Sequence, residues 1–567
     1  MTNISWFKRN KIPYLIFIFG WLVLNLIQAY FTQLHYDEAY YWVYSQKLAW
    51  GYFDHPPMVA FLVKVGYSLF QNELGVRLFF VIMGTSTMAM IIYLIKETQK
   101  LSLLFIFLLS IPLIHFHVSG FIATPDIPLV FFATLFFVLY KKFIEENTYS
   151  LALLIGVVAA AMLYSKYHGV LILTFTLLSN IKLLKNKKVW VALLVMVTLM
   201  LPHLYWQVSN HFPTLNFQVS GRIKGIESKY IFDYLGGQLI MPGLLTGIIA
   251  LFLVIKYKSE DQFDKTLKLN IYGFLMFFFA FSFRMGIEAH WTAAILPALA
   301  VISFKSLQKR EKLIKWFVPL ALVGIIALFF GRIVIINDSI AKKLPIISNF
   351  NYWKHTVEKF KEISENKKVI FVSNYQYAAE YSFYTKKITP SLAMIGYRFS
   401  HFDFNHFDEI YKNKDVVIIE EVSNEYKGKA VKIKPNNTFR YTFIKNYTPF
   451  HQIDIKCNTK SISGRPRDTT ICVITVKNTS SEKIIFNSNP QLLPSICYEI
   501  SGSSHEEWYK QIQEIINRNY LDPKEEMKLK IPVVLPKEPG QLMIRFHVSY
   551  GATYRGTSSE LIKINEK

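Results

Sequence analysis

The sequence predicts a multi-span α-helical membrane protein with a soluble C-terminal part that contains strands. Of the 567 residues, 52% are hydrophobic and 18% are charged, and the mean hydropathy is +0.25. Soluble domains carry about a quarter of charged residues, so this composition argues against a disordered chain and a wholly soluble enzyme. Long apolar segments recur up to about residue 335, and the pattern after it is that of a soluble protein. We therefore expect a transmembrane domain over residues 1–335.

The first apolar segment, residues 13–32, is long enough to span a bilayer as a helix. Basic residues precede it as in a signal peptide, but no small-residue cleavage site follows, so we expect a retained helix. Ten further spans bring the expected number to about eleven. They cover residues 75–95, 101–118, 127–140, 150–165, 169–181, 189–208, 235–255, 268–283, 291–304 and 316–335.

The basic residues predict the orientation of these spans. With a cytoplasmic N-terminus, Lys and Arg concentrate in every second connection, as the positive-inside rule requires. The cytoplasmic segments would carry Lys8, Arg9, Lys11, Lys96, Lys100, Lys141, Lys142, Lys182, Lys185, Lys187, Lys188, Lys256, Lys258, Lys265, Lys268, Lys305, Lys309, Arg310, Lys312 and Lys315. The opposite connections hold fewer, namely Lys47, Lys64, Arg77, Lys166, Arg222, Lys224, Lys229 and Arg284.

The same orientation explains much of the net charge of +23, of which +14 lies up to residue 335 and +9 after it. We therefore expect no nucleic-acid partner. An odd number of spans places the C-terminal part outside the cytoplasm. The predicted location is a bacterial inner membrane, with a cytoplasmic N-terminus and a periplasmic C-terminal region.

Residues 336–450 are expected to form an extracytoplasmic α/β domain. Short β-branched runs at 368–373 and 415–420 stand beside helical stretches at 353–365 and 377–384.

Residues 451–567 are expected to form a β-sandwich-like domain. Short alternating strands at 470–476, 528–532 and 542–549 are separated by turns rich in Pro, Gly and Asn. The three cysteines are too few for a disulfide framework, and whether Cys457 pairs with Cys472 stays open.

Polar residues collect in the connections that this topology places outside. The first of them, residues 33–74, is too long for a simple connector, and we expect two amphipathic helices there, lying in the interface. It carries Asp37, Glu38 and a GYFDHPP block that includes Asp54 and His55. The later outer connections carry Asp126, Lys166, Tyr167, His168, His203, His211, Arg284, His290 and Trp291. Because buried polar groups are costly in a membrane, we expect them to line one extracytoplasmic cavity.

Most of these candidates also have a structural explanation. Glu38 and Asp126 stand where a carboxylate favours the N-terminus of a helix. Lys166 and Arg284 have side chains that can extend to lipid headgroups, although a phosphate partner suits Arg284 well. Trp291 fits the aromatic belt of a membrane surface.

These loops carry a pattern that resembles bacterial members of the GT-C glycosyltransferase superfamily, especially protein mannosyltransferases of the dolichyl-phosphate-mannose type and lipid A aminoarabinose transferases. The pattern begins with Asp37-Glu38 and the GYFDHPP block. The further elements are TPDIPL (124–129), SKY (165–167), PHLYWQVSNHFPTLNFQ (202–218), HWTAA (290–294) and YQYAAEYSFY (375–384). The resemblance covers roughly residues 30–400, and His55 stands where the lipid A transferases tend to have Lys.

The resemblance implies a sugar donor linked to a polyprenyl phosphate and transfer outside the cytoplasm. It makes Asp37 the acidic catalytic residue, with Glu38 and Asp54 as further loop acids. It places Lys166 and Arg284 near the donor phosphate. The remaining candidates for substrate binding are Asp126, His55, Tyr167 and Trp291.

The chemistry of the residues agrees with this reaction. A lipid phosphate that leaves needs cationic stabilisation, and an acceptor needs a base or an orienting carboxylate. A single displacement inverts the anomeric carbon. A divalent metal ion is an alternative source of positive charge, and its candidate ligands are Asp54, His55 and His211.

The expected acceptor is lipid A or another envelope glycolipid, with a protein as the alternative. A transporter or flippase for lipid-linked sugars is a rival function, but its polar residues would gather at mid-membrane. A sensor or scaffold with a glycan-binding outer domain would leave the acids of the loops unexplained.

Overall fold

The structure is a computed structural model. It describes residues 11–95, 98, 100–116, 118–220, 227–337, 353–394, 399–422, 430–434, 437–449, 451–486, 489–501, 508–515, 518–535, 542–550, 554–560 and 562–566. The chain divides into two compact units, Met1–Tyr352 and Trp353–Lys567. Among the basic residues that predict the topology, Lys8, Arg9, Lys96, Arg222 and Lys224 lie outside the described residues.

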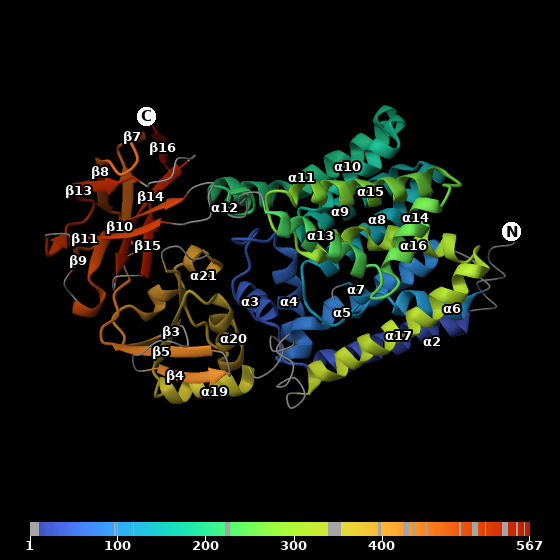
Figure 1. The fold of residues 1–567 in the computed structure, drawn as a ribbon, viewed down its shortest axis with the longest axis horizontal. Helices are drawn as coiled ribbons and strands as arrows, with labels where there is room; N and C mark the ends of the chain where they lie inside the picture. Colours follow the sequence, from blue (N-terminus) through green and yellow to red (C-terminus); the bar gives the residue numbers. More distant parts are fainter. Residues whose placement is uncertain are drawn as a thin grey trace. The chain divides into compact units, whose positions relative to one another are not determined.

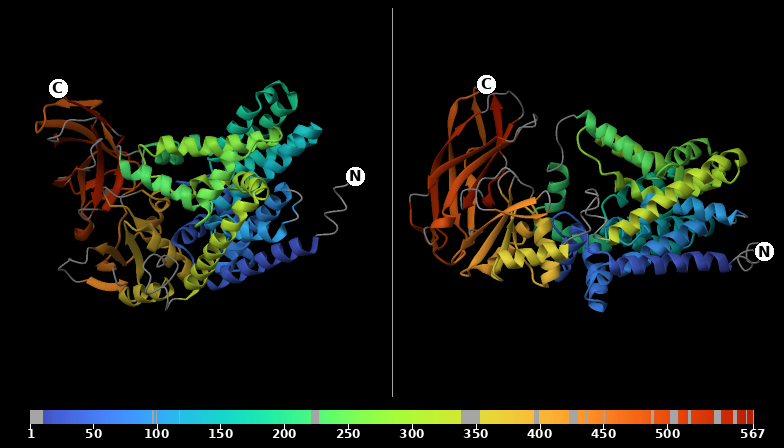
Figure 2. Two further views of the ribbon diagram at one scale, coloured as in Figure 1. Left: turned by 45° about the vertical axis from the view of Figure 1, so that its right-hand side comes forward. Right: turned by 60° about the horizontal axis from the view of Figure 1, so that its bottom comes forward.

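The first unit is a bundle of helices (Figure 1). In the part of the chain that the structure describes, six helical segments are long and apolar enough to cross a membrane. They are α2 (Lys11–Phe31), α5 (Glu73–Ile95), α8 (Asp126–Glu146), α11 (Lys187–Ser209), α17 (Glu311–Ile336), and the 3-10 helix η2 (Ala289–Ile295) continued by α16 (Leu296–Leu307). Helices α2 and α17 contact each other and run side by side (Figure 2).

The other five predicted spans coincide with helices that are shorter, interrupted or more polar. They are α6 (Leu101–Leu109) with α7 (Pro112–His115), α9 (Tyr149–Ser165), α10 (Gly169–Ser179), α13 (Ser228–Ile240) with α14 (Gly247–Lys256), and α15 (Gln262–Phe281). Pro112 interrupts the first of these, because proline lacks the N–H that a helix interior needs. Pro242 and Gly243 lie in the interruption between α13 and α14. Helices therefore occur at all the predicted segments.

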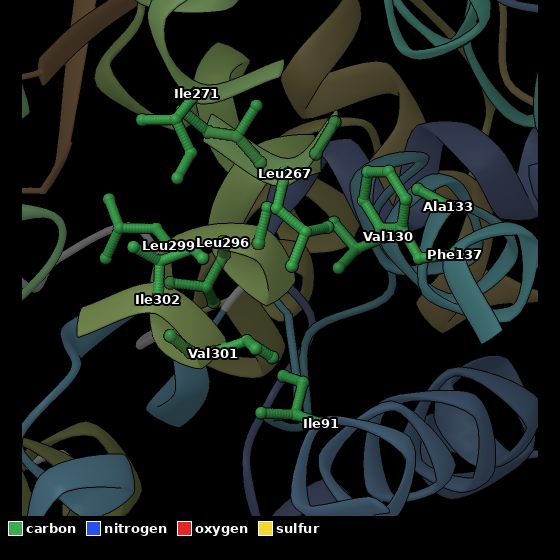
Figure 3. Close-up of a cluster of buried hydrophobic side chains, with 14 of the residues drawn as sticks. Ile91, Val130, Ala133, Phe137, Leu267, Ile271, Leu296, Leu299, Val301 and Ile302 are labelled. Atoms are coloured by element: carbon green, nitrogen blue, oxygen red, sulfur yellow. The ribbon is translucent and has the colours of Figure 1, made fainter. Parts of the chain in front are cut away.

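The core of this unit lies where α5, α8, α15 and α16 meet (Figure 3). Ile91, Phe137, Leu267 and Ile302 are fully buried there. Large apolar side chains also cover the exterior, where Ile326 is 69% exposed. A surface of this kind is unfavourable in water but suits contact with lipid.

The connection over residues 33–74, which the sequence predicts to lie outside, contains two helices as expected, α3 (Tyr36–Gln46) and α4 (Met58–Leu69). The expectation that both are amphipathic surface helices is wrong for α3, whose residues from Glu38 to Ser45 are all buried. Aromatic side chains surround it: the Trp42 ring packs edge-on against Tyr67, and the Tyr44 ring stacks on Tyr52. Helix α3 therefore packs inside the first unit.

The second unit begins with an α/β region. Its sheet has the strand order β2-β1-β3-β5-β4, in which β1 is parallel to β2 and β3, and the remaining pairs are antiparallel. The strands are β1 (Lys368–Val372), β2 (Ser391–Leu392), β3 (Val416–Val422), β4 (Ala430–Lys434) and β5 (Asn437–Ile444). Helices α19 (Trp353–Ile363) and α20 (Tyr375–Thr385) precede and follow β1, which confirms the predicted strands and helices.

The rest of the second unit consists of β-strands that pack as sheets. One sheet has the order β11-β10-β14-β16-β7, with β15 beside β14, and another the order β13-β8-β6. The strands are β6 (Ile453–Cys457), β7 (Ser461–Gly464), β8 (Thr469–Asn478), β10 (Pro494–Ser501), β11 (Trp508–Ile515), β13 (Glu526–Val534), β14 (Leu542–Tyr550), β15 (Tyr554–Ser558) and β16 (Ile562–Glu566), with the short pair β9 (Ile484–Ile485) and β12 (Tyr520–Leu521). This arrangement confirms the three predicted strands.

One apolar cluster joins the α/β sheet to these strands. Ile418 of β3, Ile474 of β8 and Phe546 of β14 are all buried in it. The regions 336–450 and 451–567 therefore share a core in their described parts. The three cysteines, Cys457, Cys472 and Cys497, are free thiols.

Candidate active site

Three connections of the first unit bring titratable side chains together. Asp126 is the first residue of α8, Lys166 follows the last residue of α9, and His290 lies in η2. Lys166 Nζ is 2.8 Å from Asp126 Oδ1, and His290 Nε2 is 3.8 Å from Asp126 Oδ2. The Asp126 side chain is 3% exposed. We call these three residues the Asp126 cluster.

Local backbone structure explains how the cluster forms. Helix α8 begins with Pro125 as N-cap, and no side chain caps it, so Asp126 is not the N-cap residue. Its carboxylate still lies in the first turn, where the helix dipole favours negative charge. Lys166 is the C-cap of α9 and has an extended backbone, with φ −163° and ψ 140°. The chain leaves the helix there, and the Lys166 side chain reaches Asp126 instead of extending to headgroups.

His168 extends the Asp126 cluster toward the connection over residues 33–74. It lies within electrostatic range of all three residues of the cluster and of His55. Its ring centroid is 5.5 Å from that of Trp291, and its Nδ1 atom is buried with no hydrogen-bond partner among the described residues. His55, Asp126, His168 and His290 come from four different connections that the sequence predicts to lie outside, and these connections therefore approach one another here.

The GYFDHPP block is fixed by aromatic side chains. Asp54 is buried and accepts a short hydrogen bond from the hydroxyl group of Tyr44. The hydroxyl group of Tyr41 lies 3.4 Å from His55 Nε2. Gly51 has no room for a side chain, because a Cβ atom there would overlap with the Trp206 ring of α11. The aromatic residues of α3 thus place Asp54 and His55.

Tyr167, in the connection between α9 and α10, contacts side chains of α11. Its hydroxyl group lies 2.8 Å from His203 Nε2 and accepts a hydrogen bond of 2.7 Å from Gln207 Nε2. Gln207 also donates to Thr214, which donates to the carbonyl oxygen of Tyr52. The Tyr167 hydroxyl group, predicted to bind substrate, is thus engaged in a network that holds the GYFDHPP block.

Glu38 forms a buried ion pair with Arg77. Arg77 Nε of α5 donates to Glu38 Oε1 at 2.7 Å, and the backbone N–H of Ala123 donates to the same oxygen at 2.7 Å. The other oxygen accepts from the backbone N–H of His35 and completes a capping box. Both charged side chains are 0% exposed. Glu38 therefore joins α3, α5 and the segment before α8.

The remaining candidates differ in exposure. The Asp37 side chain is 38% exposed and lies 3.7 Å from His35 Nδ1. Trp291 is buried against His168 and Phe278 and does not lie in an exposed belt. Arg284 is exposed, in the turn after α15, and its side chain forms no ion pair with a described residue.

The chain resembles known glycosyltransferases in sequence and in fold. Residues 54–206 match the family model of dolichyl-phosphate-mannose-protein mannosyltransferase. The crystal structure of ArnT from Cupriavidus metallidurans in the apo state is similar, with a TM-score of 0.55 and 13% identity over 76% of this chain and 97% of that one. The chain therefore shares the fold of ArnT, and its residues 54–206 resemble the mannosyltransferase family.

A second structure of ArnT, bound to undecaprenyl phosphate, matches this chain with a TM-score of 0.53 and 13% identity. It covers the same shares of the two chains, 76% and 97%. No curated protein sequence is significantly similar to the chain. At this identity, the likeness to ArnT concerns the fold.

The three predicted metal ligands are not brought together in one group. The described residues contain no group of three or more His, Cys, Asp or Glu side chains that could hold a metal ion. His211 lies between α11 and the short helix α12 (Pro213–Ser220), exposed and with a left-handed φ of 59°. Asp54 and His55 are held by Tyr44 and Tyr41 instead.

Two residues of this site, His168 and His290, are not among those that the sequence analysis predicts to bind the substrate. His290 directly precedes the predicted Trp291, and His168 directly follows the predicted Tyr167. Their positions inside the SKYH and HWTAA segments were the available signal. Isolated histidines are usually structural, and only the fold shows that both lie beside Asp126.

Proposed function

We propose that this protein is a glycosyltransferase of the GT-C type that transfers a sugar from a polyprenyl-phosphate donor to an acceptor on the outer side of a bacterial inner membrane. The observation that carries the proposal is the Asp126 cluster, in which a lysine and a histidine flank one buried carboxylate. The match to ArnT bound to undecaprenyl phosphate supports a donor of this chemical class.

In this proposal, Lys166 and His290 hold the donor phosphate. Negative charge grows on the phosphate oxygen as the bond to the anomeric carbon breaks, and cations that are already in place stabilise it. Asp126 orients both side chains through its two oxygens and is a positioning residue. Arg284, which is exposed and forms no ion pair with a described residue, is the further candidate cation.

Asp37 is the proposed acceptor-side residue. The acceptor oxygen forms a bond to the anomeric carbon while the bond from that carbon to the phosphate oxygen breaks, which inverts the anomeric centre. The proton of the acceptor hydroxyl group passes to the Asp37 carboxylate, and the electron pair of the broken bond stays on the phosphate. Asp37 suits this role because its side chain is partly exposed. Glu38 is engaged by Arg77, and we assign it a positioning role.

The proposed acceptor is lipid A or another envelope glycolipid, because the loops resemble those of lipid A aminoarabinose transferases. A protein is the second candidate acceptor, and the family-model match over residues 54–206 favours it. Mass spectrometry of lipid A, other envelope glycans and secreted proteins, from cells with and without the gene, distinguishes the two.

The decisive experiment measures sugar transfer by the purified protein and by its Lys166→Ala and Asp126→Asn variants, with a polyprenyl-phosphate sugar as donor. We expect transfer by the wild type and strongly reduced transfer by both variants. A protein that moves the lipid-linked sugar across vesicles without forming a product would be a flippase, and that result would overturn the proposal.

A further inference from the structure

A second polar site lies in the connections between α14 and α15 and between α16 and α17. It is a cavity of about 400 Å³, lined by Lys256, Tyr257, Lys258, Ser259, Glu260, Ser306, Lys309 and Arg310. None of these residues belongs to the candidate active site. We call this cavity the basic pocket.

The basic pocket and the Asp126 cluster lie at opposite ends of the same helical segment. His290 stands at the start of Ala289–Leu307, and Ser306 stands at its end. Seven residues of 3-10 helix and twelve of α-helix together span roughly 32 Å, close to the thickness of the hydrocarbon layer of a bilayer. The positive-inside pattern assigns this end to the cytoplasmic face. The basic pocket therefore belongs to the leaflet opposite the candidate active site.

The charges of the pocket favour an anion. Four lining side chains are cationic and one is a carboxylate, Glu260, which pairs with Lys309. Lys256 and Lys258 are exposed and form no ion pair with a described residue. Arg310 makes two long hydrogen bonds, of 3.3 Å to the carbonyl oxygen of Lys256 and 3.4 Å to Ser306 Oγ. A guanidinium carries five N–H donors, so several remain for a ligand.

The carboxylate beneath the pocket is already neutralised by other groups. Asp264 is buried, and its Oδ1 pairs with Lys305 Nζ at 2.8 Å. Its Oδ2 accepts from the Tyr257 hydroxyl group at 2.7 Å. Lys268 Nζ donates to the carbonyl oxygen of Tyr257, which fixes this wall of the pocket. The pocket cations therefore do not serve as partners of Asp264.

An apolar surface continues from the pocket along α14. Ile248, Phe252 and Ile255 recur at helical spacing and are 66%, 45% and 65% exposed. Lys256 Nζ lies 5.8 Å from the centre of the Phe252 ring. A ligand with a phosphate and acyl chains would match the cations and this surface together. A free phosphate would use only the cations.

We propose that the basic pocket binds the phosphate group of an anionic phospholipid in the cytoplasmic leaflet, with its acyl chains along α14. Basic pockets between helices at this face of a membrane are suited to acidic headgroups. The site is independent of sugar transfer, since it shares no residue with the Asp126 cluster.

The test uses the full-length protein in nanodiscs of phosphatidylcholine, with and without phosphatidylglycerol, and native mass spectrometry to count retained lipids. We expect the wild type to retain phosphatidylglycerol preferentially. In the Lys256→Gln/Lys258→Gln variant, the preference for phosphatidylglycerol over phosphatidylcholine should be roughly 10- to 30-fold weaker, as expected for the loss of two phosphate-facing cations. The matched control, Lys182→Gln/Lys185→Gln, removes two exposed lysines of another predicted cytoplasmic connection and should behave as the wild type.

Equal retention of the two lipids by the wild type, or an equal loss in pocket and control variants, would overturn the proposal. Inorganic phosphate that binds in place of the lipid, with the same sensitivity to the pocket substitutions, would identify a free phosphate as the ligand and also overturn it. If the double variant unfolds in phosphatidylcholine, the single variant Lys258→Gln replaces it, with an expected loss of roughly five-fold.

Discussion

Arg77 on α5 and Glu38 on α3 form a fully buried ion pair, in which the guanidinium donates to both carboxylate oxygens. Asp37, the adjacent residue, keeps 38% of its side chain exposed. Two carboxylates that look equivalent in the sequence therefore have different surroundings, and their substitution should have different consequences.

Glu38→Gln should destabilise the protein, because it leaves the Arg77 charge buried without its partner. Breaking a buried ion pair from one side costs about 3–5 kcal/mol. Thermal unfolding of the full chain in detergent measures the change, with Asp37→Asn as the matched control one residue away. An unchanged unfolding temperature for Glu38→Gln would show that the pair does not hold α3 in place.

Asp37→Asn should abolish sugar transfer while the protein still inserts and folds. The amide cannot accept the proton of the acceptor hydroxyl group, although its size is nearly that of the carboxylate. Transfer assays and gel-filtration profiles on the same preparation separate loss of activity from loss of fold. Turnover near the wild-type level would remove Asp37 from the proposed mechanism.

Lys166→Ala should weaken the use of the donor, because it removes the cation that lies closest to Asp126. Loss of one group that stabilises the leaving oxygen typically lowers kcat by about 100- to 1,000-fold. Arg284→Ala should also weaken donor use, since we place Arg284 near the same phosphate. Kinetics at varied donor concentration measure both effects.

Lys229→Ala is the control for these two variants, because Lys229 also lies in a predicted outer connection and is exposed. Unchanged donor kinetics in both Lys166→Ala and Arg284→Ala would contradict a phosphate site at these residues.

The stability of the second unit should depend on pH through His406 and His451, whose ring centres are 4.2 Å apart. Burial, together with the charge on His451, lowers the pKa of His406 to about 4. Folding therefore favours neutral His406, and stability should fall as the pH drops from about 6.5 toward 4. His406→Gln should remove this loss.

His451 should act in the opposite sense. Burial alone would lower the pKa of His451, but Asp408, with Oδ1 at 2.6 Å from His451 Nε2, and the nearby Glu409 and Asp403 raise it. Its stabilising contribution is therefore complete below about pH 6.5 and is lost as the pH rises through the raised pKa. Hydrogen exchange around residues 401–411, measured against pH for wild type, His406→Gln and His451→Gln, checks both statements. Superimposable profiles for the three proteins would contradict them.

The topology is open to a direct test with fused reporters. An odd number of spans places the chain after residue 345 outside the cytoplasm, so a periplasm-specific reporter fused there should be active. A reporter fused in the connection between α14 and α15 should read cytoplasmic, because that segment carries the basic pocket. A cytoplasmic signal after residue 345 would refute the predicted orientation.

The sequence by itself determined the helices of the first unit and several strands of the second. Span 75–95 and strand 368–373 were predictable because apolar runs and β-branched alternation are local properties of the chain. The sequence also identified Asp126, Lys166 and the GYFDHPP block as candidates, since polar residues are costly in an apolar protein.

Only the tertiary structure decided how these candidates work together. Asp126 and Lys166 are 40 residues apart in sequence, and His290 lies further along the chain, so no local pattern shows that one carboxylate faces both. Likewise, Arg77 stands 39 residues after Glu38, and nothing in the Asp37-Glu38 dipeptide tells which carboxylate it engages. Partners of this kind are set by how the helices pack. A buried charge has lost its hydration, so its free energy depends on which group the fold places within about 3 Å of it.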